Sequence, residues 1–247
     1  MTEPITANHI SVSYSGKQVV QDVSFTFAPG SLIGVLGPNG AGKSTLMKAM
    51  LGLIKKDNGT VQIGSEPIER KRKIIAYVPQ RSNIDWNFPI VVKDTVLLGT
   101  YPKLGLFRRP SKQDKAWAMD CLKQVGMQDF ADRQIGELSG GQQQRVFLAR
   151  ALAQKADYFF LDEPFVGIDV SSEEVIINIL RKLKEQGKTV FVVHHDLSKV
   201  KSYFDELILM NRELIGAGPV DQVFQERNMT RAYNRPMTMF DDVEVQV

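Results

Sequence analysis

The chain has almost no cysteine and no long hydrophobic run, and both absences narrow its class. Cys121 is the only cysteine among 247 residues, so no internal disulfide can form, which fits a reducing compartment. We expect Cys121 to be a small buried side chain on a helix. No apolar stretch approaches the roughly 18 residues of a membrane span. Residues 1–7 lack the basic and then apolar pattern of a signal peptide, so we expect neither a span nor a signal peptide.

Neither sign of charge is present in large excess. The 31 Lys and Arg residues against 28 Asp and Glu leave a net charge of +3, which is too small to indicate a nucleic-acid partner. The basic clusters Arg70–Lys73 and Arg108–Arg109 are typical of solvated surface. A hydrophobic content of 43% with 24% charged residues is ordinary for a globular protein of one large domain or two small lobes.

One glycine-rich stretch stands out between the apolar run Leu32–Leu36 and the helix-like segment Thr45–Leu51. It fits the phosphate-binding pattern G-x-x-x-x-G-K-[ST], and it lies between a strand and a helix as that loop requires. Its residues are Gly37, Pro38, Asn39, Gly40, Ala41, Gly42, Lys43, Ser44 and Thr45. We therefore predict a strand, a phosphate loop and a helix in this order.

The residue types of this loop suit a nucleotide. Glycines let successive backbone N–H groups turn toward one anion, and the following helix adds the positive end of its dipole. Lys43 can reach the terminal phosphates, and the Ser44 hydroxyl can bind Mg²⁺. A nucleotide with Mg²⁺ is the expected ligand.

An antiparallel β layer is expected before the loop. Ile5–Tyr14 alternates loosely and Val23–Phe27 alternates strictly between apolar and polar residues, as half-buried strands do. Ser15–Lys17 between them indicates a turn. Tyr14 ends the first strand, where its ring can stack on an adenine or can be a partly buried edge side chain. The pattern fits both.

A helical lobe is expected after two short strands, Thr60–Ile63 and Ile74–Val78. Gln80 lies just beyond the second strand and is a candidate ligand of Mg²⁺ or of a water molecule. From residue 81 to residue 139 the chain carries aromatic residues among prolines, and Asp114–Val125 has helical spacing. We read 81–139 as a mostly helical insertion into the core.

A second glycine motif, Leu138–Gln142, closes the lobe. Ser139 with Gln142 three residues later forms a capping box, so the sequence predicts that a helix over Gln143–Ala153 begins here. Gly140 and Gly141 leave backbone N–H groups open to another phosphate. For the pentapeptide taken alone, a capped helix without any ligand is the favoured interpretation.

Two carboxylates follow the apolar run Tyr158–Leu161, which is typical of a parallel strand buried on both faces. They lie at the carboxyl end of the strand, where ligands of open α/β sheets bind. Asp162 suits a Mg²⁺ contact through water, and Glu163 suits a general base for the attacking water. A surface acidic pair fits poorly beside four apolar residues and Pro164.

The remaining elements complete an α/β core. Glu173–Lys184 predicts an amphipathic helix, and Thr189–Val193 predicts a buried strand that ends at two histidines. His194 and His195 face opposite ways because they are adjacent, so we expect one to be packed and the other to face the site. The pattern then predicts an edge hairpin formed by Glu206–Met210 and Glu213–Gly216, followed by a short helix at Val220–Phe224. The last residues, Asn234–Val247, are expected to form a loosely attached tail.

Together these pieces resemble the nucleotide-binding subunit of an ABC transporter over nearly the whole chain. The resemblance identifies Gly37–Thr45 as the phosphate loop, Tyr14 as the adenine platform and Gln80 as the Q-loop residue. It identifies Leu138–Gln142 as the signature motif and Tyr158–Glu163 as the Walker B strand. Asp169 is then the D-loop aspartate and His195 the switch histidine. It implies an α/β fold: a P-loop ATPase core with a mostly parallel sheet, an N-terminal antiparallel β layer and the inserted lobe. Residues 1–247 then form one ABC ATPase domain with a core of 1–80 and 140–225, a helical subdomain of 81–139 and a tail of 226–247.

The resemblance also implies a head-to-tail homodimer that holds two ATP molecules at its interface. Each ATP then lies between the phosphate loop of one copy and Ser139, Gly140, Gly141 and Gln142 of the other. Glu163 polarises the water and His195 contacts the γ-phosphate, with Lys43 and Gln80 completing the catalytic set. Mg²⁺ is assigned to Ser44, Gln80 and Asp162. The D-loop, Val166–Asp169, departs slightly from the family pattern.

Membrane permease subunits are the further partners that the resemblance implies, and they place this subunit at the cytoplasmic face of the cell membrane. The docking surface falls within 80–109, where an apolar groove is expected from Ile84, Trp86, Phe88, Leu104, Leu106 and Phe107. An extracellular metal-binding protein is an indirect partner, and no nucleic acid is expected.

Several stretches are similar to the branch that imports manganese, zinc and iron. They are Val78–Pro89, Leu104–Pro110, Phe147–Ala151 and Val192–Leu197. Manganese is the first expectation, with zinc or iron as alternatives. A soluble ABC ATPase of translation or DNA repair is the rival class. Translation-type members usually carry two nucleotide domains and repair-type members carry coiled-coil insertions, whereas this chain has each motif once and no heptad run.

Overall fold

The computed structural model describes residues 2–104 and 108–234, which form two compact units. The phosphate-loop unit comprises Glu3–Ala28, Ile33–Glu69 and the described residues from His195 onward. The helical unit comprises Thr2, Pro29–Leu32 and Arg70–His194. Leu106, Phe107 and the predicted tail from residue 235 lie outside the described residues.

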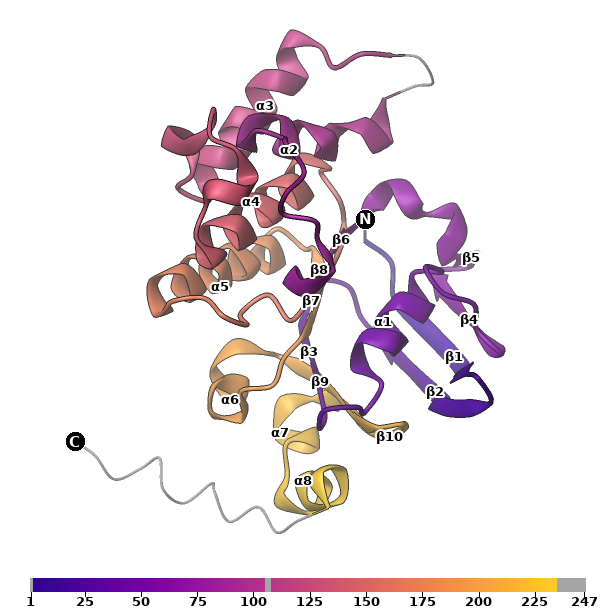
Figure 1. The fold of residues 1–247 in the computed structure, drawn as a ribbon. Coiled ribbons are helices and arrows are strands. Elements are labelled where there is room, and N and C mark those ends of the chain that lie inside the picture. Colours follow the sequence, from indigo (N-terminus) through magenta and orange to yellow (C-terminus); the bar gives the residue numbers. More distant parts are fainter. Residues whose placement is uncertain (1, 105–107, 235–247) are drawn as a thin grey trace, which may run out of the picture. The chain divides into compact units, whose positions relative to one another are not determined.

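The phosphate-loop unit begins with the expected antiparallel layer (Figure 1). Ile5 lies opposite Phe27 on one side and Ile63 on the other, and all three side chains are buried, so this face belongs to the core. Antiparallel layers of this kind bury one face and leave the other to solvent. The strands are β1 (Ile5–Tyr14), β2 (Lys17–Phe27), β4 (Asn58–Ile63) and β5 (Glu66–Pro67).

The same unit carries the strand and helix on either side of the phosphate loop. All residues of β3 (Leu32–Leu36) are buried, and α1 (Lys43–Met50) follows the loop. β3 pairs in parallel with β9 (Glu206–Asn211), which pairs antiparallel with β10 (Glu213–Pro219). The strand order within this unit is β5-β4-β1-β2-β10-β9-β3.

The expected edge position of the β9–β10 hairpin is wrong. The hairpin itself forms, but β9 pairs with β3 and β10 pairs with β2, so both strands are interior. Leu207–Met210 are all buried, which is the pattern of a strand covered on both faces. That run of apolar residues was the sequence signal for an interior strand.

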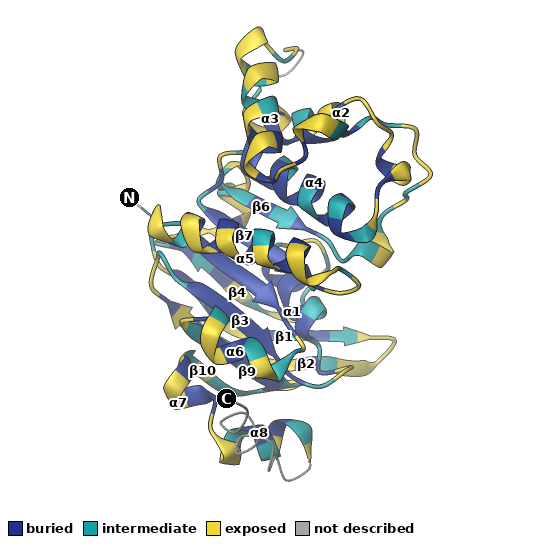
Figure 2. Cartoon of the chain, turned by 90° about the vertical axis from the view of Figure 1, so that its left-hand side faces the viewer, coloured by how far each residue is buried: buried dark blue, intermediate teal, exposed yellow. Residues whose placement is uncertain are grey.

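In the helical unit, three parallel strands place their carboxyl ends together. β7 (Tyr158–Asp162) pairs in parallel with both β6 (Ile75–Val78) and β8 (Thr189–Val193). Every residue of β7 and β8 is buried, as the dark blue of β7 shows in Figure 2. The residues that follow β6 and β7, namely Gln80 and Glu163, therefore start from one edge of the strands.

The segment between β6 and the signature motif is helical, as predicted, and the longer helices pack on one another. α4 packs against α2, α3 and α5, and Cys121 on α3 is buried as expected. α4 begins at Gly140 rather than Gln143 because the Ser139 cap precedes the glycines. The helices are α2 (Val92–Leu97), α3 (Lys112–Gln124), α4 (Gly140–Ala153) and α5 (Val170–Glu185). Short 3-10 turns connect them at Arg81–Asn83, Leu98–Lys103, Gln128–Phe130 and Ile135–Glu137.

The C-terminal part contains a helix that the sequence analysis did not expect. α8 (Glu226–Tyr233) buries Met229 and Ala232, and Asn211 Nδ2 donates a hydrogen bond to Ala232 O at 2.9 Å. Two short helices precede it, α6 (Val200–Tyr203) and the predicted α7 (Val220–Val223). Among the described residues, no helix is long and apolar enough to cross a membrane.

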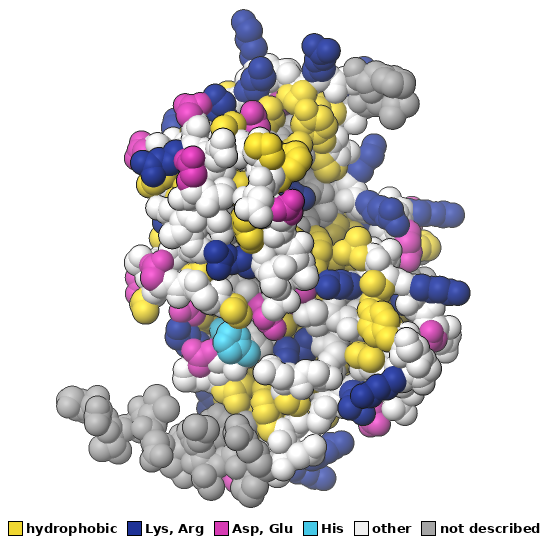
Figure 3. All heavy atoms as spheres, in the orientation of Figure 1, with side chains coloured by type: hydrophobic (Ala, Val, Ile, Leu, Met, Phe, Trp, Pro, Cys, Tyr) yellow, Lys and Arg dark blue, Asp and Glu magenta, His cyan; other side chains and the backbone are white. Residues whose placement is uncertain are grey.

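Basic and acidic side chains are interspersed over the face drawn in Figure 3.

Candidate functional site

The phosphate loop needs glycine at two positions for steric reasons. At Gly42 the backbone has φ of 90°, and a Cβ there would lie 2.6 Å from Val19 O. At Gly37 the φ is 151°, and a Cβ would collide with Met210 O. Arg212 N donates a hydrogen bond to Ala41 O at 2.9 Å, which ties the loop to the β9–β10 turn. The predicted strand–loop–helix order is confirmed.

Lys43 points its ammonium group into this loop. Its Nζ donates hydrogen bonds to Gly37 O at 2.8 Å and to Pro38 O at 2.9 Å. The residue is only 6% exposed, so the charge is held where the loop curls. α1 begins at Lys43 with no side-chain cap, so the positive end of its dipole follows the loop directly. Ser44 lies in the same turn.

Tyr14 lies at the end of β1 and is 48% exposed. One flank of its ring is therefore in solvent, as a stacking platform requires. Stacking on adenine stays a prediction.

Asp162 ends β7 and is fully buried, with 0% exposure. Tyr77 Oη on β6 donates to Asp162 Oδ2 at 3.5 Å. Burial, followed by the nearby Asp162 carboxylate, raises the pKa of Tyr77 well above its ordinary value. Tyr77 therefore stays protonated and keeps a hydroxyl proton to donate to Asp162.

Glu163 directly follows β7 and meets the Q-loop. Gln80 Nε2 donates a hydrogen bond to Glu163 Oε2 at 2.7 Å. The backbone of Glu163 is left-handed, with φ of 52°. Non-glycine residues adopt this conformation rarely, and the residues that do are concentrated at functional sites. A hollow of about 330 Å³ opens beside this pair. It is lined by Gln80, Arg81, Ser82, Trp86, Glu163, Val166 and Gly167.

The signature motif forms the predicted capping box. Gln142 N donates to Ser139 Oγ at 3.3 Å, and Ser139 N donates to Gln142 Oε1 at 2.9 Å. Ser139 is exposed, so its hydroxyl can face a ligand from outside the chain. The capped start of α4 is confirmed, and the phosphate contact of Ser139, Gly140, Gly141 and Gln142 stays a prediction.

The D-loop aspartate supports the start of α4. Asp169 caps α5 through Ser171 and Ser172, and these hydrogen bonds hold the pKa of its carboxyl well below the usual range. A Cβ on Gly141 would collide with Ser172 Oγ and would lie 2.9 Å from Asp169 Oδ2. Gly141 is therefore needed for close packing of α4 on the D-loop, apart from any contact with a ligand.

Two residues that the sequence analysis did not assign to the site, Arg81 and Trp86, tie the Q-loop to α4. Arg81 Nε donates to Gln143 Oε1 at 3.0 Å, and Trp86 Nε1 donates to Arg81 O at 3.1 Å. The Trp86 ring meets Phe147 edge-on, with 5.4 Å between centroids. Adjacency to Gln80 was the only signal for Arg81, because its partner lies 62 positions away in the chain.

One of the two histidines is packed, as predicted, and the expectation that the other faces the site stays a prediction. His194 is buried and meets the Phe165 ring edge-on at 5.4 Å, whereas His195 is exposed just beyond β8. The helical unit thus carries Gln80, Asp162, Glu163, Ser139–Gln142 and Asp169, and the phosphate-loop unit carries Tyr14, Gly37–Thr45 and His195. Within the described residues, no three His, Cys, Asp or Glu side chains group as a metal site.

Comparison with known proteins identifies the family. Residues 20–166 match the ABC transporter family. The chain belongs to that family. ATP binding, and ATP hydrolysis coupled to transport, follow from this membership.

Several similar proteins are ATP-binding proteins of metal transport systems. The manganese transport system ATP-binding protein MntB of Halalkalibacterium halodurans is 51% identical over 97% of this chain and 96% of its own length. MntB of Bacillus subtilis is 48% identical, with the same shares covered. The zinc transport system ATP-binding protein TroB of Treponema pallidum is 48% identical over 93% of this chain and 86% of its own.

Solved structures agree on the fold. An inward-facing putative metal-chelate type ABC transporter has a chain that superimposes with a TM-score of 0.83 at 26% identity, covering 96% of this chain and 90% of that one. An ATP-binding cassette of an ABC transporter in its ADP conformation gives 0.78 at 25% identity, covering 95% and 99%. The α/β fold predicted from the motifs is confirmed.

Proposed function

We propose that this chain is the ATP-hydrolysing motor subunit of an ABC importer for a divalent transition metal, with Mn²⁺ as the transported ion. One observation supports the motor role above the others. Glu163 lies at the carboxyl end of a buried strand, next to buried Asp162, and accepts a hydrogen bond from Gln80. Residues 1–247 then form one ATPase domain, with its core at 1–80 and 140–225, its helical part at 81–139 and its tail at 226–247.

Hydrolysis then rests on positioning and charge. The Glu163 carboxylate takes the proton of the attacking water, which Gln80 helps to orient. Lys43 and the loop N–H groups bind the phosphates, and His195 contacts the γ-phosphate. The Ser44 hydroxyl, the buried Asp162 carboxylate and the Gln80 amide are hard oxygen donors that fit Mg²⁺. When bound, Mg²⁺ supplies positive charge to the β- and γ-phosphate oxygens.

A second copy completes each site. Ser139 is exposed at the start of α4, so a phosphate brought by another chain can reach it. We place the ATP held by Gly37–Thr45 of one copy against Ser139–Gln142 of the other. Asp169 lies behind Gly141 and sets the position of that edge.

Permease subunits dock on residues 80–109, which places this subunit at the cytoplasmic face of the membrane. None of the described apolar side chains predicted for this groove, Ile84, Trp86, Phe88 and Leu104, is fully buried, and Phe88 is 60% exposed. Leu98 and Tyr101 add exposed apolar surface at 45% and 48%. Such surface suits the apolar face of a short helix. An extracellular metal-binding protein would meet the permease rather than this chain.

Manganese is favoured because relatives named as manganese proteins reach 55% identity over 91% of the chain. Zinc is the second candidate, because the zinc relative is 48% identical.

The test is to purify the chain with its permease, reconstitute the complex in vesicles with a metal-sensitive dye, and compare ATP-dependent uptake of Mn²⁺ and Zn²⁺. Uptake of Mn²⁺ that is lost in Glu163→Gln supports the proposal. Selective Zn²⁺ uptake would transfer it to zinc. ATPase activity without any membrane partner or metal uptake would favour the soluble class.

A further inference from the structure

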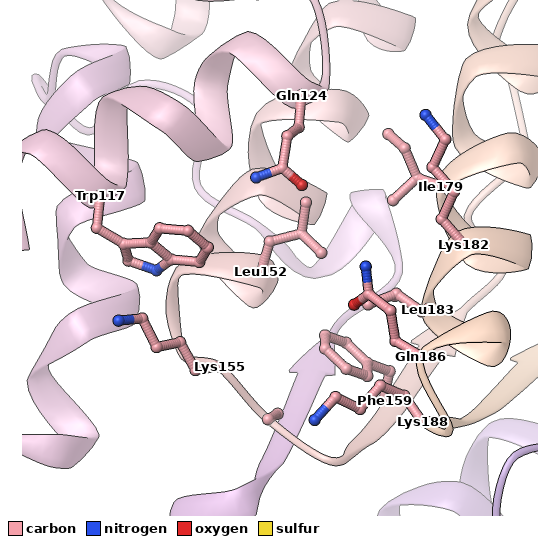
Figure 4. Close-up of a pocket in the computed structure, with 11 residues that line it drawn as sticks. Trp117, Gln124, Leu152, Lys155, Phe159, Ile179, Lys182, Leu183, Gln186 and Lys188 are labelled. Atoms are coloured by element: carbon pink, nitrogen blue, oxygen red, sulfur yellow. The ribbon is translucent and has the colours of Figure 1, made fainter.

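The helical unit contains a second and larger hollow, of about 380 Å³, away from the residues assigned to ATP (Figure 4). We call it the lysine-rimmed groove. Trp117 of α3 and Lys155 lie on one side of it, and α5 contributes Ile179 and Leu183 on the other. The groove is lined by Trp117, Gln124, Leu152, Lys155, Ala156, Phe159, Ile179, Lys182, Leu183, Gln186 and Lys188.

The floor of the groove is apolar and well fixed. Leu152, Phe159 and Leu183 line the hollow and are only 7%, 1% and 6% exposed, so they are anchored in the core. Trp117 Nε1 donates a hydrogen bond to Ala153 O at 3.1 Å, which holds the indole at the wall. A preformed apolar floor is what small-molecule sites share.

The rim carries an excess of positive charge. Lys155, Lys182 and Lys188 line the groove, and Asp157 pairs with Lys188 at 2.6 Å. Lys103 Nζ joins them by donating to Lys155 O at 2.8 Å. Burial is the main cause that lowers the pKa of Lys103; Asp157 comes next and raises it, and the smaller effects of Lys155 and Lys188 lower it. In the part of the chain that the structure describes, Lys155 and Lys182 form no ion pair that offsets the rim's charge in the way that Asp157 offsets Lys188, so the rim suits an anion.

Helix capping accounts for only part of this arrangement. Lys182 lies near the last turn of α5, where a cation stabilises the helix dipole. Lys155 follows the C-cap of α4 with a left-handed backbone, φ 52°, at a position where helices most often carry glycine. Its ammonium lies 4.6 Å from the Trp117 ring centre. Capping explains cations near helix ends, but it does not explain the apolar hollow between them.

We propose that the lysine-rimmed groove binds a small amphipathic organic anion. The apolar body of the ligand lies on Leu152, Phe159 and Leu183, and its carboxylate, sulfonate or phosphate group meets Lys155 and Lys182. The amides of Gln124 and Gln186 are donors for further polar atoms. The volume is in the range of small-molecule pockets, about 300–1,000 Å³.

The groove and the residues assigned to ATP lie at opposite ends of β7. Phe159 lies at the amino end of β7, whereas Asp162 and Glu163 lie at and beyond its carboxyl end. A ligand in the groove should therefore bind together with ATP rather than in its place.

The probe is 8-anilinonaphthalene-1-sulfonate, an aromatic body with one sulfonate. In a Trp86→Phe background Trp117 is the only tryptophan of the chain, so energy transfer from Trp117 to the probe reports binding in the groove. We expect one saturable probe per chain, weaker binding at high salt, and no displacement by saturating Mg-ATP. N-phenyl-1-naphthylamine, which lacks the sulfonate, should bind about ten-fold more weakly or worse, because hydrogen bonds between charged groups are lost. Octanoate should displace the probe, and inorganic phosphate alone should not.

The lysines are tested by substitution. Lys155→Gln with Lys182→Gln should weaken probe binding about ten-fold or more and leave N-phenyl-1-naphthylamine binding unchanged. Lys123→Gln is the matched control, because Lys123 is exposed on α3 next to Gln124 but does not line the groove. Unchanged probe affinity in the double variant, displacement by Mg-ATP, or many probes per chain would each overturn the proposal. Melting temperatures confirm folding, and no step depends on ATP hydrolysis or transport.

Discussion

Gln80 Nε2 donates a hydrogen bond to Glu163 Oε2 at 2.7 Å, although the two residues are 83 positions apart in the chain. They meet because β6 and β7 are parallel neighbours whose carboxyl ends lie at one edge. The bond fixes the carboxylate of the proposed general base while its backbone is left-handed. The Q-loop segment that provides Gln80 is also tied to α4 by Arg81 and Trp86, so Glu163 and the signature helix share one support.

Replacing Glu163 by Gln should retain ATP binding and reduce ATP turnover by at least about a hundred-fold, because general-base catalysis contributes roughly 10²–10⁴-fold. The amide keeps the shape of the side chain but cannot take a proton. Steady-state phosphate release and nucleotide affinity are the measurements. Glu174→Gln, on the exposed face of α5, is the matched control. Near-normal turnover in clean Glu163→Gln protein would remove this residue from the role.

Tyr14 is 48% exposed at the end of β1, and its ring should stack on the adenine. Such stacking is worth roughly 1–3 kcal/mol. Tyr14→Ala should therefore weaken ATP binding about five-fold to a hundred-fold, whereas Tyr14→Phe should nearly preserve it. Titration with a fluorescent ATP analogue measures both. If Phe proved as damaging as Ala, the hydroxyl rather than the ring would be the contact.

Ser139 should act on the ATP of the other copy. Lys43→Ala and Ser139→Arg are each expected to be inactive alone, while a mixture should recover part of the ATPase activity. A mixed dimer contains one intact composite site, and its other site carries both defects. Differently tagged subunits show whether mixed dimers form. Mixed dimers without activity would count against the trans arrangement.

Phe88→Glu should leave basal ATPase activity intact and uncouple it from transport. Phe88 is 60% exposed in the proposed permease-docking segment, so a charge there disturbs docking more than folding. Leu53→Glu is the control, since Leu53 is 56% exposed outside that segment. Trp86→Glu should instead lower the melting temperature, because Trp86 packs on Phe147. Normal assembly and metal uptake by well-folded Phe88→Glu would place the contact elsewhere.

Asp169→Asn should destabilise the protein in a pH-dependent way. Hydrogen bonds from Ser171 and Ser172 hold the pKa of Asp169 below its ordinary value of 3.8. Because the folded-state pKa is the lower one, the ionised carboxylate stabilises the fold above pH 3.8, and this contribution declines as the pH falls below that value. We expect the variant to melt a few degrees below the wild type at pH 7, with a smaller difference near pH 3. Asp120→Asn, an exposed α3 position, is the control, and a difference independent of pH would contradict the charge argument.

Local features of this protein were determined by the sequence alone. The Ser139–Gln142 capping box formed as predicted, because its hydrogen bonds join residues only three positions apart. The phosphate loop lies between β3 and α1, because its glycines and its apolar strand act within a few residues. The run Tyr158–Leu161 became a buried parallel strand, since a strand without polar residues is stable only when both faces are covered. The order of the motifs along the chain carried the family resemblance.

Contacts between distant segments were decided by the tertiary structure. Local patterns did not show which strands β9 and β10 pair with, that Arg81 binds Gln143, or that Gly141 packs against Ser172. The lysine-rimmed groove likewise gathers side chains from α3, α4, β7 and α5 and from the segments beside them. Each of these depends on which elements pack side by side. That choice minimises the exposed apolar surface of the whole chain, so no short stretch of sequence contains it.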